Sequence, residues 1–240
     1  MRNVFLVFGI LLLYPFLNLN AQKTSDTSAI YSFKKGHPYG IGKWYQGREI
    51  AYVMGWQGIG WLERDEREIE ERTSLLIKNM TIKTSDVIAD IGAGSGYHVF
   101  KMAPKASAGN VYAVDIQPEM LQAMASNPKF QKNSNIKLIQ GSETSVNLPE
   151  NTFDKILMVD VYHEFNFPFE MMQSIRKAMK KDGEIYLIEY RGEDASVPIK
   201  KLHKMTEKQA IKEMKFAGFR LKKNIDNLPW QHCMVFVKAN

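Results

Sequence analysis

The sequence predicts an α/β protein in which a mostly parallel, seven-stranded sheet ends in an antiparallel C-terminal hairpin and carries helices on both faces. Three observations predict this fold. Short apolar segments alternate with helical patterns after Asp86, a glycine-rich loop follows the first of these segments, and two strand-like runs at the end leave no room for a helix between them. The 240 residues are 45% hydrophobic and 24% charged, which is enough for one sizeable core and excludes a disordered chain.

One domain is expected from residue 63 to residue 240. Residues 63–80 carry apolar side chains at helical spacing, with charges around the other face, and predict a helix. Five apolar segments then predict buried strands, at residues 87–91, 111–115, 136–140, 153–160 and 184–190. The last two strands are expected at residues 219–224 and 232–238, and they should pair antiparallel.

Helices are expected between the strands, because start and stop residues occur there. Pro118 and Pro168 each stand where a first helical residue would be, and Thr206 opens a capping box. Residues 182–183 (Asp-Gly) are expected to end the helix that begins at Pro168, and Gly218 is expected to end the last helix.

The N-terminus has the layout of a secretory signal peptide. In residues 1–21, Arg2 precedes an uninterrupted apolar run at residues 4–13, and Leu19-Asn20-Ala21 is a small-residue cleavage site. The run is short for a membrane span, which needs about 20 apolar residues. We therefore expect export to the periplasm or beyond by a cleaved signal peptide, with an uncleaved membrane anchor as the alternative.

Residues 22–62 lie between the signal peptide and the domain. Residues 22–30 are polar and predict a flexible leader. Residues 31–62 interleave eight aromatic side chains with seven glycines and follow neither the strand nor the helix period, although residues 48–54 fit a short helix. Such a segment packs onto a preformed body, either as a plain covering layer or as a lid over a pocket.

The loop after the first strand of the domain carries the main functional signal. It reads DIGAGSGY at residues 90–97, and its glycines allow a tight turn and a close approach of the backbone to a ligand. Asp115 ends the next strand, where a carboxylate accepts hydrogen bonds from the hydroxyls of an adenosine ribose. The glycine spacing is G-x-G-x-G, which differs from the G-x-G-x-x-G of nicotinamide dinucleotide sites. The pattern therefore indicates an adenosine-bearing ligand of another kind.

These motifs resemble those of class I S-adenosylmethionine-dependent methyltransferases. DIGAGSGY, VDIQPEML and GSETSVNLPENTFD occur in that family's order, ahead of the antiparallel tail, and the similarity covers about residues 75–240. The resemblance implies a Rossmann-like fold and S-adenosyl-L-methionine as the cofactor. WLERDEREIEER and EYRGEDASVPIKKLHKMTEKQ also resemble predicted bacterial methyltransferases that carry signal peptides and have no assigned substrate.

The resemblance also implies a role for each residue that matches a family motif. Asp90 would face the ammonium of the methionine part, directly or through water, Asp115 would hold the ribose, and Ile116 would pack on the adenine. After the third strand, where the family carries an acidic pair that reads the adenine amino group, this chain has Ser142 and Glu143. The other implied cofactor-binding residues are Gly92, Ala93, Gly94, Gly96 and Asp160.

The catalytic candidates follow the fourth strand in the sequence DVYHEF, residues 160–165. The resemblance places Asp160 beside the transferred methyl group. His163 is the candidate general base, which is needed only if the acceptor loses a proton, and Tyr162 is a weaker candidate. The alternative for both is a structural role. No metal site is expected, because the spacings of the histidines match no metal-ligand pattern.

The acceptor expected from the sequence is a small molecule or a component of the cell envelope, and export would allow association with the envelope or membrane. Nucleic acid is not an expected partner, because the net charge of +6 is spread along the chain without a compact basic block. Two alternatives remain: a protein that binds the cofactor without turnover, and a protein methyltransferase. No feature of the sequence sets the oligomeric state.

Overall fold

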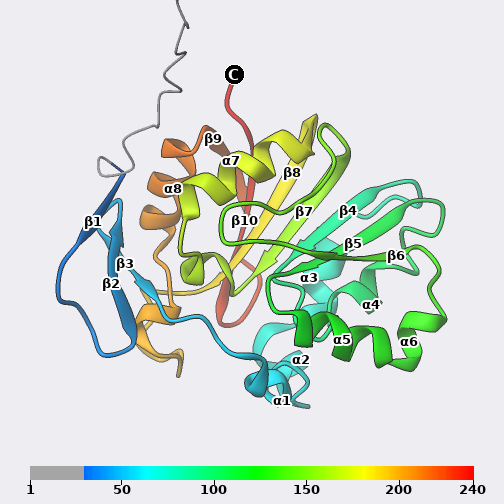
Figure 1. Cartoon of the computed structure of the whole chain (residues 1–240), viewed down its shortest axis with the longest axis horizontal. Coiled ribbons are helices and arrows are strands. Elements are labelled where there is room, and N and C mark those ends of the chain that lie inside the picture. Colours follow the sequence, from blue (N-terminus) through cyan, green and yellow to red (C-terminus); the bar gives the residue numbers. More distant parts are fainter. Residues whose placement is uncertain (1–29) are drawn as a thin grey trace, which may run out of the picture.

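The computed structural model describes residues 30–240, in which a seven-stranded sheet forms the centre of the molecule (Figure 1). Its strands are β4 (Val87–Ile91), β5 (Asn110–Asp115), β6 (Ile136–Gln140), β7 (Phe153–Val159), β8 (Met179–Tyr190), β9 (Phe219–Asn224) and β10 (Gln231–Lys238). They lie in the order β6-β5-β4-β7-β8-β10-β9; β10 pairs antiparallel with β8 and β9, and the other pairs are parallel. The predicted fold class is confirmed. The chain leaves β4 toward one edge and returns beside it with β7, and this switch point is where open α/β sheets bind ligands.

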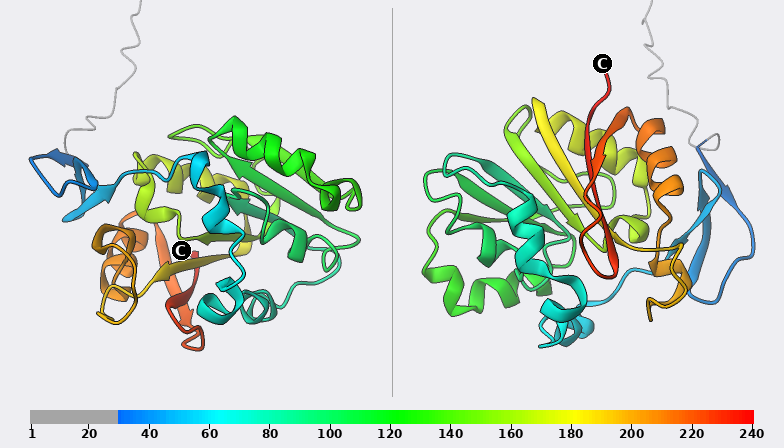
Figure 2. Two further views of the ribbon diagram at one scale, coloured as in Figure 1. Left: turned by 90° about the horizontal axis from the view of Figure 1, so that it is seen from below. Right: turned by 180° about the vertical axis from the view of Figure 1, so that it is seen from behind.

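Helices cover both faces of the sheet (Figures 1 and 2). Along β7, Ile156 and Met158 face one core, which contains α7 (Pro168–Ala178) and α8 (Glu207–Phe216). Leu157 faces the other core, which contains α3 (Thr73–Asn79), α4 (Val99–Met102) and α5 (Pro118–Ser126), with the short α6 (Pro128–Gln131) beside it. This alternation along a strand that is buried on both faces explains why its sequence is almost entirely apolar.

Four of the local helix signals act as expected, those at Pro118, Pro168, Thr206 and Gly218. Pro118 and Pro168 are the first residues of α5 and α7. Thr206 caps α8, and its hydroxyl oxygen accepts a hydrogen bond from the backbone amide of Gln209 at 3.1 Å. Gly218 follows α8 with φ +90°, a conformation that favours glycine.

The helix expected over residues 63–80 is wrong as a single element. The structure has α1 (Ile59–Leu62), α2 (Arg67–Glu71) and α3, with Arg72 between the last two in the left-handed region at φ +49°. Glu68 explains the break, because its carboxylate accepts hydrogen bonds from the Thr73 hydroxyl and the Ser74 amide at the start of α3. A side chain of α2 thus satisfies a backbone amide and a hydroxyl at the start of a separate helix.

Strand β8 begins five residues before its expected start, and α7 ends at Ala178 rather than at residues 182–183. Gly183 lies within the strand, where a Cβ atom would come 2.8 Å from the carbonyl oxygen of Phe153. The glycine is therefore needed for close packing of two strands rather than for a helix end. Residues 141–152, between β6 and β7, contain no helix, contrary to the expectation of one in each connection.

Residues 31–51 form a small antiparallel sheet of β1 (Tyr31–Phe33), β2 (Gly40–Tyr45) and β3 (Arg48–Ala51). The short helix expected at residues 48–54 is wrong. Tyr45 pairs with Arg48 across a two-residue loop, Gln46-Gly47, in which both residues have positive φ, +50° and +92°. That backbone is typical of a tight β-hairpin, so β2 must be followed by a strand. The 3-10 helix η2 (Trp56–Gly58) and α1 follow.

The small sheet is held against α7 and α8 by apolar and ionic contacts. Tyr31, Tyr45 and Ile50 are buried against Phe167 and Phe169. Arg48 forms two hydrogen bonds to the carboxylate of Glu213 on α8, at 2.7 and 2.9 Å. The predicted signal peptide, residues 1–21, lies outside the described residues. Within residues 30–240, none of the helices has both the length and the apolar composition that a membrane span requires.

Candidate active site

A cavity of about 580 Å³ lies at the carboxyl ends of the central strands. Gly92 follows β4, Asp115 ends β5, Gly141 follows β6, Asp160 follows β7 and Tyr190 ends β8, and all five line it. The cavity is therefore at the switch point of the sheet, where the loop motifs predict a ligand.

The glycine loop forms part of the cavity wall through Gly92 and Gly94. Their φ angles are +72° and +55°, in the left-handed region. A Cβ atom at Gly92 would come 2.4 Å from Cγ2 of Val161, and one at Gly94 would come 2.6 Å from Cδ1 of Leu62. Side chains are thus excluded here by both backbone conformation and space.

Ala93 and Gly96 do not line the cavity, although the family resemblance includes them in the cofactor loop. Ala93 is buried in the core on the side of α3 and α4. Gly96, at φ +88°, packs closely against Met124 of α5 and Phe100. Both residues therefore pack the glycine loop against the protein core, on the side away from the cavity.

Asp115 lies on the cavity wall with its carboxylate oriented by the backbone. Oδ2 accepts a hydrogen bond from the Gly94 amide, and Oδ1 accepts one from the Gln117 amide, each at 2.9 Å. Burial raises the pKa of Asp115, and these amides oppose the shift. Ile116, next in sequence, also lines the cavity and is 42% exposed, so its side chain is open to a planar ligand.

Ser142 and Glu143 line the cavity beyond β6. The Ser142 hydroxyl accepts a hydrogen bond from the Ser145 amide at 3.1 Å, within its own turn. The Glu143 carboxylate accepts one from the side-chain amide of Asn166 at 2.7 Å. Glu143 is therefore positioned to contact a ligand, whereas Ser142 mainly holds its turn.

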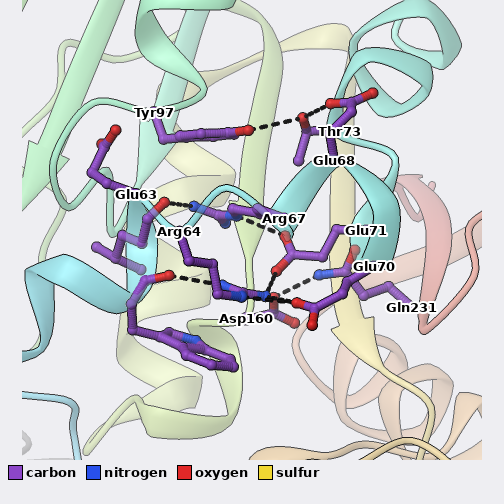
Figure 3. A network of polar contacts seen from close by, with 12 residues as sticks. Glu63, Arg64, Arg67, Glu68, Glu70, Glu71, Thr73, Tyr97, Asp160 and Gln231 are labelled. Carbon is purple, nitrogen blue, oxygen red and sulfur yellow. Dashed lines mark hydrogen bonds and ion pairs between the residues drawn. The ribbon is translucent and has the colours of Figure 1, made fainter.

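Charged side chains from residues 63–71 form a network of polar contacts (Figure 3), and part of this network lines the cavity. Arg67 and Glu71 of α2 form an ion pair at 2.8 Å, and Arg64 adds a second at 2.6 Å to the same Glu71. The Tyr190 hydroxyl donates to Glu71 at 2.9 Å. Arg67, Glu71 and Tyr190 line the cavity.

Asp160 lies beside this network (Figure 3) and lines the cavity. Its backbone is in the left-handed region at φ +51°, an uncommon and strained conformation for a residue other than glycine. One carboxylate oxygen accepts a hydrogen bond from the Gln231 amide at 2.6 Å. Its Oδ1 is buried and has no partner within residues 30–240. Burial, followed by the nearby Glu71 and Glu189, raises the pKa of Asp160 well above its ordinary value.

Three further side chains, His163, Glu164 and His203, also line the cavity and form the part of its wall that is called the acceptor end below. Nδ1 of His163 lies 2.6 Å from the carboxylate of the fully buried Glu189, and its Nε2 lies 3.0 Å from Nδ1 of His203. Burial alone would lower the pKa of His163, but the charge and hydrogen bond of Glu189, with Glu164 adding to them, raise it. The contact with Glu189 fixes the orientation of the His163 ring, so that its Nε2 atom faces Glu164 and His203.

Tyr162, a predicted catalytic residue, does not line the cavity. It is fully buried in the core beside Phe165. Burial, and after it the carboxylate of Glu213, raises the pKa of Tyr162 well above its ordinary value. A tyrosine that faces the core and retains its proton is not suited to act on an acceptor, so the structural role fits it better.

The segment that crosses the cavity begins at Val53, and Met54, Trp61 and Leu62 line the cavity with it. The Met54 amide donates to Glu164 at 3.1 Å, and its carbonyl accepts from the Gln117 side chain at 3.0 Å. Of the two roles expected for residues 31–62, the small sheet matches the covering layer. Residues 53–62 are placed where a lid would be.

Comparison with known proteins assigns the family. The methyltransferase domain family matches residues 82–232, well over half of the chain. The chain belongs to this methyltransferase family. An uncharacterized methyltransferase of Bacillus subtilis, YdaC, is 30% identical over 144 residues, which are 60% of this chain and 76% of that protein. A second, YcgJ, is 23% identical over 173 residues, 70% of this chain and 68% of that protein.

Solved structures agree on the fold of this methyltransferase. A SAM-dependent methyltransferase from Aquifex aeolicus superposes with a TM-score of 0.73 at 19% identity, covering 78% of this chain and all of that one. At that identity the match concerns the fold. The predicted family and cofactor are confirmed: the protein is a class I methyltransferase that uses S-adenosylmethionine.

The site residues fit that cofactor. The glycine loop admits no side chain where a ligand approaches, and two amides orient the Asp115 carboxylate at the cavity wall. The buried, partnerless Oδ1 of Asp160 suits a cationic group of a ligand, and the Arg67 guanidinium suits an anionic one. The methionine part of S-adenosylmethionine carries one group of each kind.

Sequence reasoning missed Arg67 and Glu71 as cavity residues of the methyltransferase. Their segment, DEREIEER, reads as the solvated face of a helix, yet the two side chains are 5% and 1% exposed. The only local signal is their spacing of four residues, which allows an ion pair on one helix face. That spacing is common on exposed helices as well, so it does not by itself indicate burial.

Asp90, expected to face the cofactor's ammonium, does not line the cavity of the methyltransferase. It lies 2% exposed at the end of β4, and its Oδ2 has no partner within the described residues. Burial raises the pKa of Asp90 to about 8, with Asp115 adding to the shift and Arg67 opposing it. Any contact with the cofactor would have to pass through water or follow a small rearrangement.

Replacing Asp90 by asparagine is expected to change how stability depends on pH. An unfolded aspartate has a pKa of about 3.9, so between about pH 4 and pH 8 the unfolded chain is ionised while folded Asp90 keeps its proton. The cofactor-free protein should therefore lose stability as pH rises through this window, by up to about 1.4 kcal/mol per unit, and Asp90→Asn should lack that loss. Urea unfolding across the window measures the difference; parallel profiles would contradict it.

Proposed function

We propose that this methyltransferase methylates a small molecule whose acceptor atom carries a proton, bound at the His163 end of the cavity. The observation that carries the proposal is the continuity of the cavity. One volume of about 580 Å³ is lined by the glycine loop and Asp115 and also by His163, Glu164 and His203. Sites for small molecules measure about 300–1,000 Å³, so this volume suits a cofactor and a small acceptor.

In this proposal, the cofactor end is assigned residue by residue. Asp115 holds the ribose hydroxyls, Ile116 packs on the adenine, and Glu143 accepts a hydrogen bond from the adenine amino group. Asp160 binds the ammonium of the methionine part, and Arg67 binds its carboxylate. Each assignment uses a side chain on the cavity wall whose charge or shape complements that group.

The acceptor end supplies proton removal and orientation. S-adenosylmethionine supplies an activated methyl group on a sulfonium, so an acceptor lone pair displaces a neutral thioether. The chain must then align the acceptor and take up its proton. His163, with Nδ1 fixed by Glu189, is the residue for that proton, and Glu164 and His203 lie within reach of its Nε2.

The covering segment supports a small acceptor over a polymer. Met54 is hydrogen-bonded both to Glu164 at the acceptor end and to Gln117 next to Asp115. Trp56 adds a bond from its amide to Gln117 at 2.7 Å. These bonds hold the backbone at Met54 and Trp56 against the cavity, and a wall covered in this way favours a small acceptor that can be shielded from water.

The test is an acceptor screen with cofactor labelled in its methyl group. Acceptors are grouped by atom (amine, phenol, thiol and carboxylic acid), and both labelled product and S-adenosylhomocysteine are measured. One class of acceptor should yield both the labelled product and S-adenosylhomocysteine. With that acceptor, His163→Ala should lower kcat by about 10²–10⁴-fold, the usual contribution of proton transfer. Binding of S-adenosylhomocysteine should stay within threefold, and His37→Ala, on an exposed histidine, is the matched control.

The outcomes separate the alternatives. Cofactor binding without turnover of any group, including extracts of the cell envelope, would replace the proposal with a binding protein. Label that enters polypeptide rather than a small molecule would replace it with a protein methyltransferase. Full activity of His163→Ala would contradict the assigned acceptor end.

A further inference from the structure

We propose that the acceptor end of the cavity is a binding site for a divalent transition-metal ion. The ligands are Nε2 of His163, Oε1 of Glu164 and Nδ1 of His203. These atoms come from two short 3-10 helices, η3 (Tyr162–Glu164) and η4 (Lys201–His203), which lie far apart in the sequence. One ligand atom from each side chain lies within 4.8 Å of the others, and all three side chains line the cavity.

The distances match those between ligands of one ion. Nε2 of His163 lies 3.0 Å from Nδ1 of His203 and 3.7 Å from Oε1 of Glu164, and the last two atoms are 3.3 Å apart. Ligands about 2.0–2.2 Å from a tetrahedral zinc ion lie roughly 3.3–3.6 Å from one another, and adjacent octahedral ligands lie roughly 3 Å apart. The three side chains are therefore gathered at coordination distances without a change of backbone.

Neighbouring groups orient two of the three ligands. The Glu189 carboxylate lies 2.6 Å from Nδ1 of His163, so Nδ1 carries the hydrogen and Nε2 presents its lone pair to the cluster. A metal-binding histidine almost always donates its other ring hydrogen in this way. The Met54 amide donates to Oε2 of Glu164 at 3.1 Å, which leaves Oε1 for the ion.

The local charge also favours a cation. The Glu164 side chain is 9% exposed and that of Glu189 is fully buried, so two carboxylates lie in a poorly solvated space beside His163. The nearby Arg48 guanidinium is committed elsewhere, because Nε and Nη2 bind Glu213 and Nη1 donates to the carbonyl oxygen of His163. Buried carboxylates require paired cations, and a divalent ion balances both at once.

The donor set narrows the class of ion. Two imidazoles and one carboxylate suit first-row divalent ions such as Zn²⁺ and Fe²⁺, whereas Mg²⁺ and Ca²⁺ prefer oxygen ligands only. Three protein ligands leave positions open on the cavity side. This deepens the proposed function and rests on it: an ion there would hold the acceptor atom and lower its pKa, so that its proton would leave to solvent before methyl transfer, and His163 would act as a ligand rather than as the base.

The test uses Zn²⁺ as the probe and omits both cofactor and acceptor. Calorimetric titration of the purified, chelator-treated protein should show one tight site per chain. Glu189→Gln should weaken binding by about 10–100-fold, the usual effect of an outer-shell change, and His203→Ala and Glu164→Gln should weaken it further. His203 is partly exposed, so its truncation removes little packing, and His37→Ala controls for binding to surface histidines.

Circular dichroism confirms that each variant is folded, and binding of S-adenosylhomocysteine to each separates this proposal from the proposed function. Zinc affinity that is the same in wild type and His203→Ala, or that falls equally in His37→Ala, would overturn the metal site. Tight zinc binding in a protein that does not bind S-adenosylhomocysteine would support the metal site and contradict the cofactor assignments.

Discussion

Replacing Asp115 by alanine is expected to weaken S-adenosylmethionine binding by at least about 100-fold. A hydrogen bond to a charged group contributes about 1.5–3 kcal/mol, and the proposed ribose contact uses two of them. Each 1.4 kcal/mol corresponds to a factor of ten in affinity. Asp115 is suited to this role because its carboxylate is held on the cavity wall by the Gly94 and Gln117 amides. Calorimetric titration with the cofactor and with S-adenosylhomocysteine measures the loss.

The Asp115→Ala experiment requires a control, because removal of the carboxylate also leaves the Gly94 and Gln117 amides without their acceptor and disturbs the glycine loop. Asp115→Asn retains one oxygen to accept a bond and should bind with intermediate affinity. Asp182→Ala removes an exposed carboxylate on β8, outside the cavity, and should bind like wild type. Binding within threefold of wild type by a folded Asp115→Ala protein would contradict the ribose assignment.

Replacing Arg48 by methionine is expected to lower the unfolding free energy by about 3–5 kcal/mol, the usual cost of removing one member of a buried ion pair. Arg48 makes two hydrogen bonds to Glu213, whose side chain is fully buried, at 2.7 and 2.9 Å. In the variant, the Glu213 carboxylate keeps the hydrogen bond from the side-chain amide of Gln209, at 2.8 Å, but loses its cation. Urea unfolding near neutral pH measures the change.

The double variant Arg48→Met/Glu213→Leu tests the cause of this loss. It removes both charges, and buried ion pairs replaced by apolar side chains of similar volume are often neutral or stabilising. The double variant should therefore recover most of the lost stability. If it is as unstable as Arg48→Met alone, the loss comes from the packing of the small sheet rather than from the unpaired Glu213.

The sheet could be predicted from the sequence because its strands are buried on both faces. Their apolar segments interrupt helical patterns clearly, and β4 and β6 have the expected bounds. The hairpin of β2 and β3 was missed because its signal lies in the conformation of Gln46, a residue that rarely takes positive φ. The early start of β8 was missed because a glycine after a helical pattern usually indicates the end of a helix. In the structure, Gly183 instead allows two strands to pack closely.

The cofactor end of the site was more predictable than the acceptor end. Asp115 and the glycine loop belong to one strand-loop-helix unit, so local spacing reveals them. His163 and His203 are 40 residues apart, and Glu189 meets His163 only because β8 lies beside β7. Spacing along the chain carries no trace of such a cluster. Arg67 and Glu71 were read as exposed because pairing, rather than residue type, decides whether a charge is buried.

A crystal structure of the protein with S-adenosylhomocysteine would test whether cofactor and acceptor share this cavity. We expect the ribose hydroxyls on Asp115, the amino-acid part beside Asp160 and Arg67, and the thioether sulfur directed toward the cluster of His163, Glu164 and His203. That direction places the departing methyl group where the acceptor is proposed to bind. A nucleoside bound outside this cavity, or a sulfur directed away from His163, would show that the cofactor and acceptor sites are assigned wrongly.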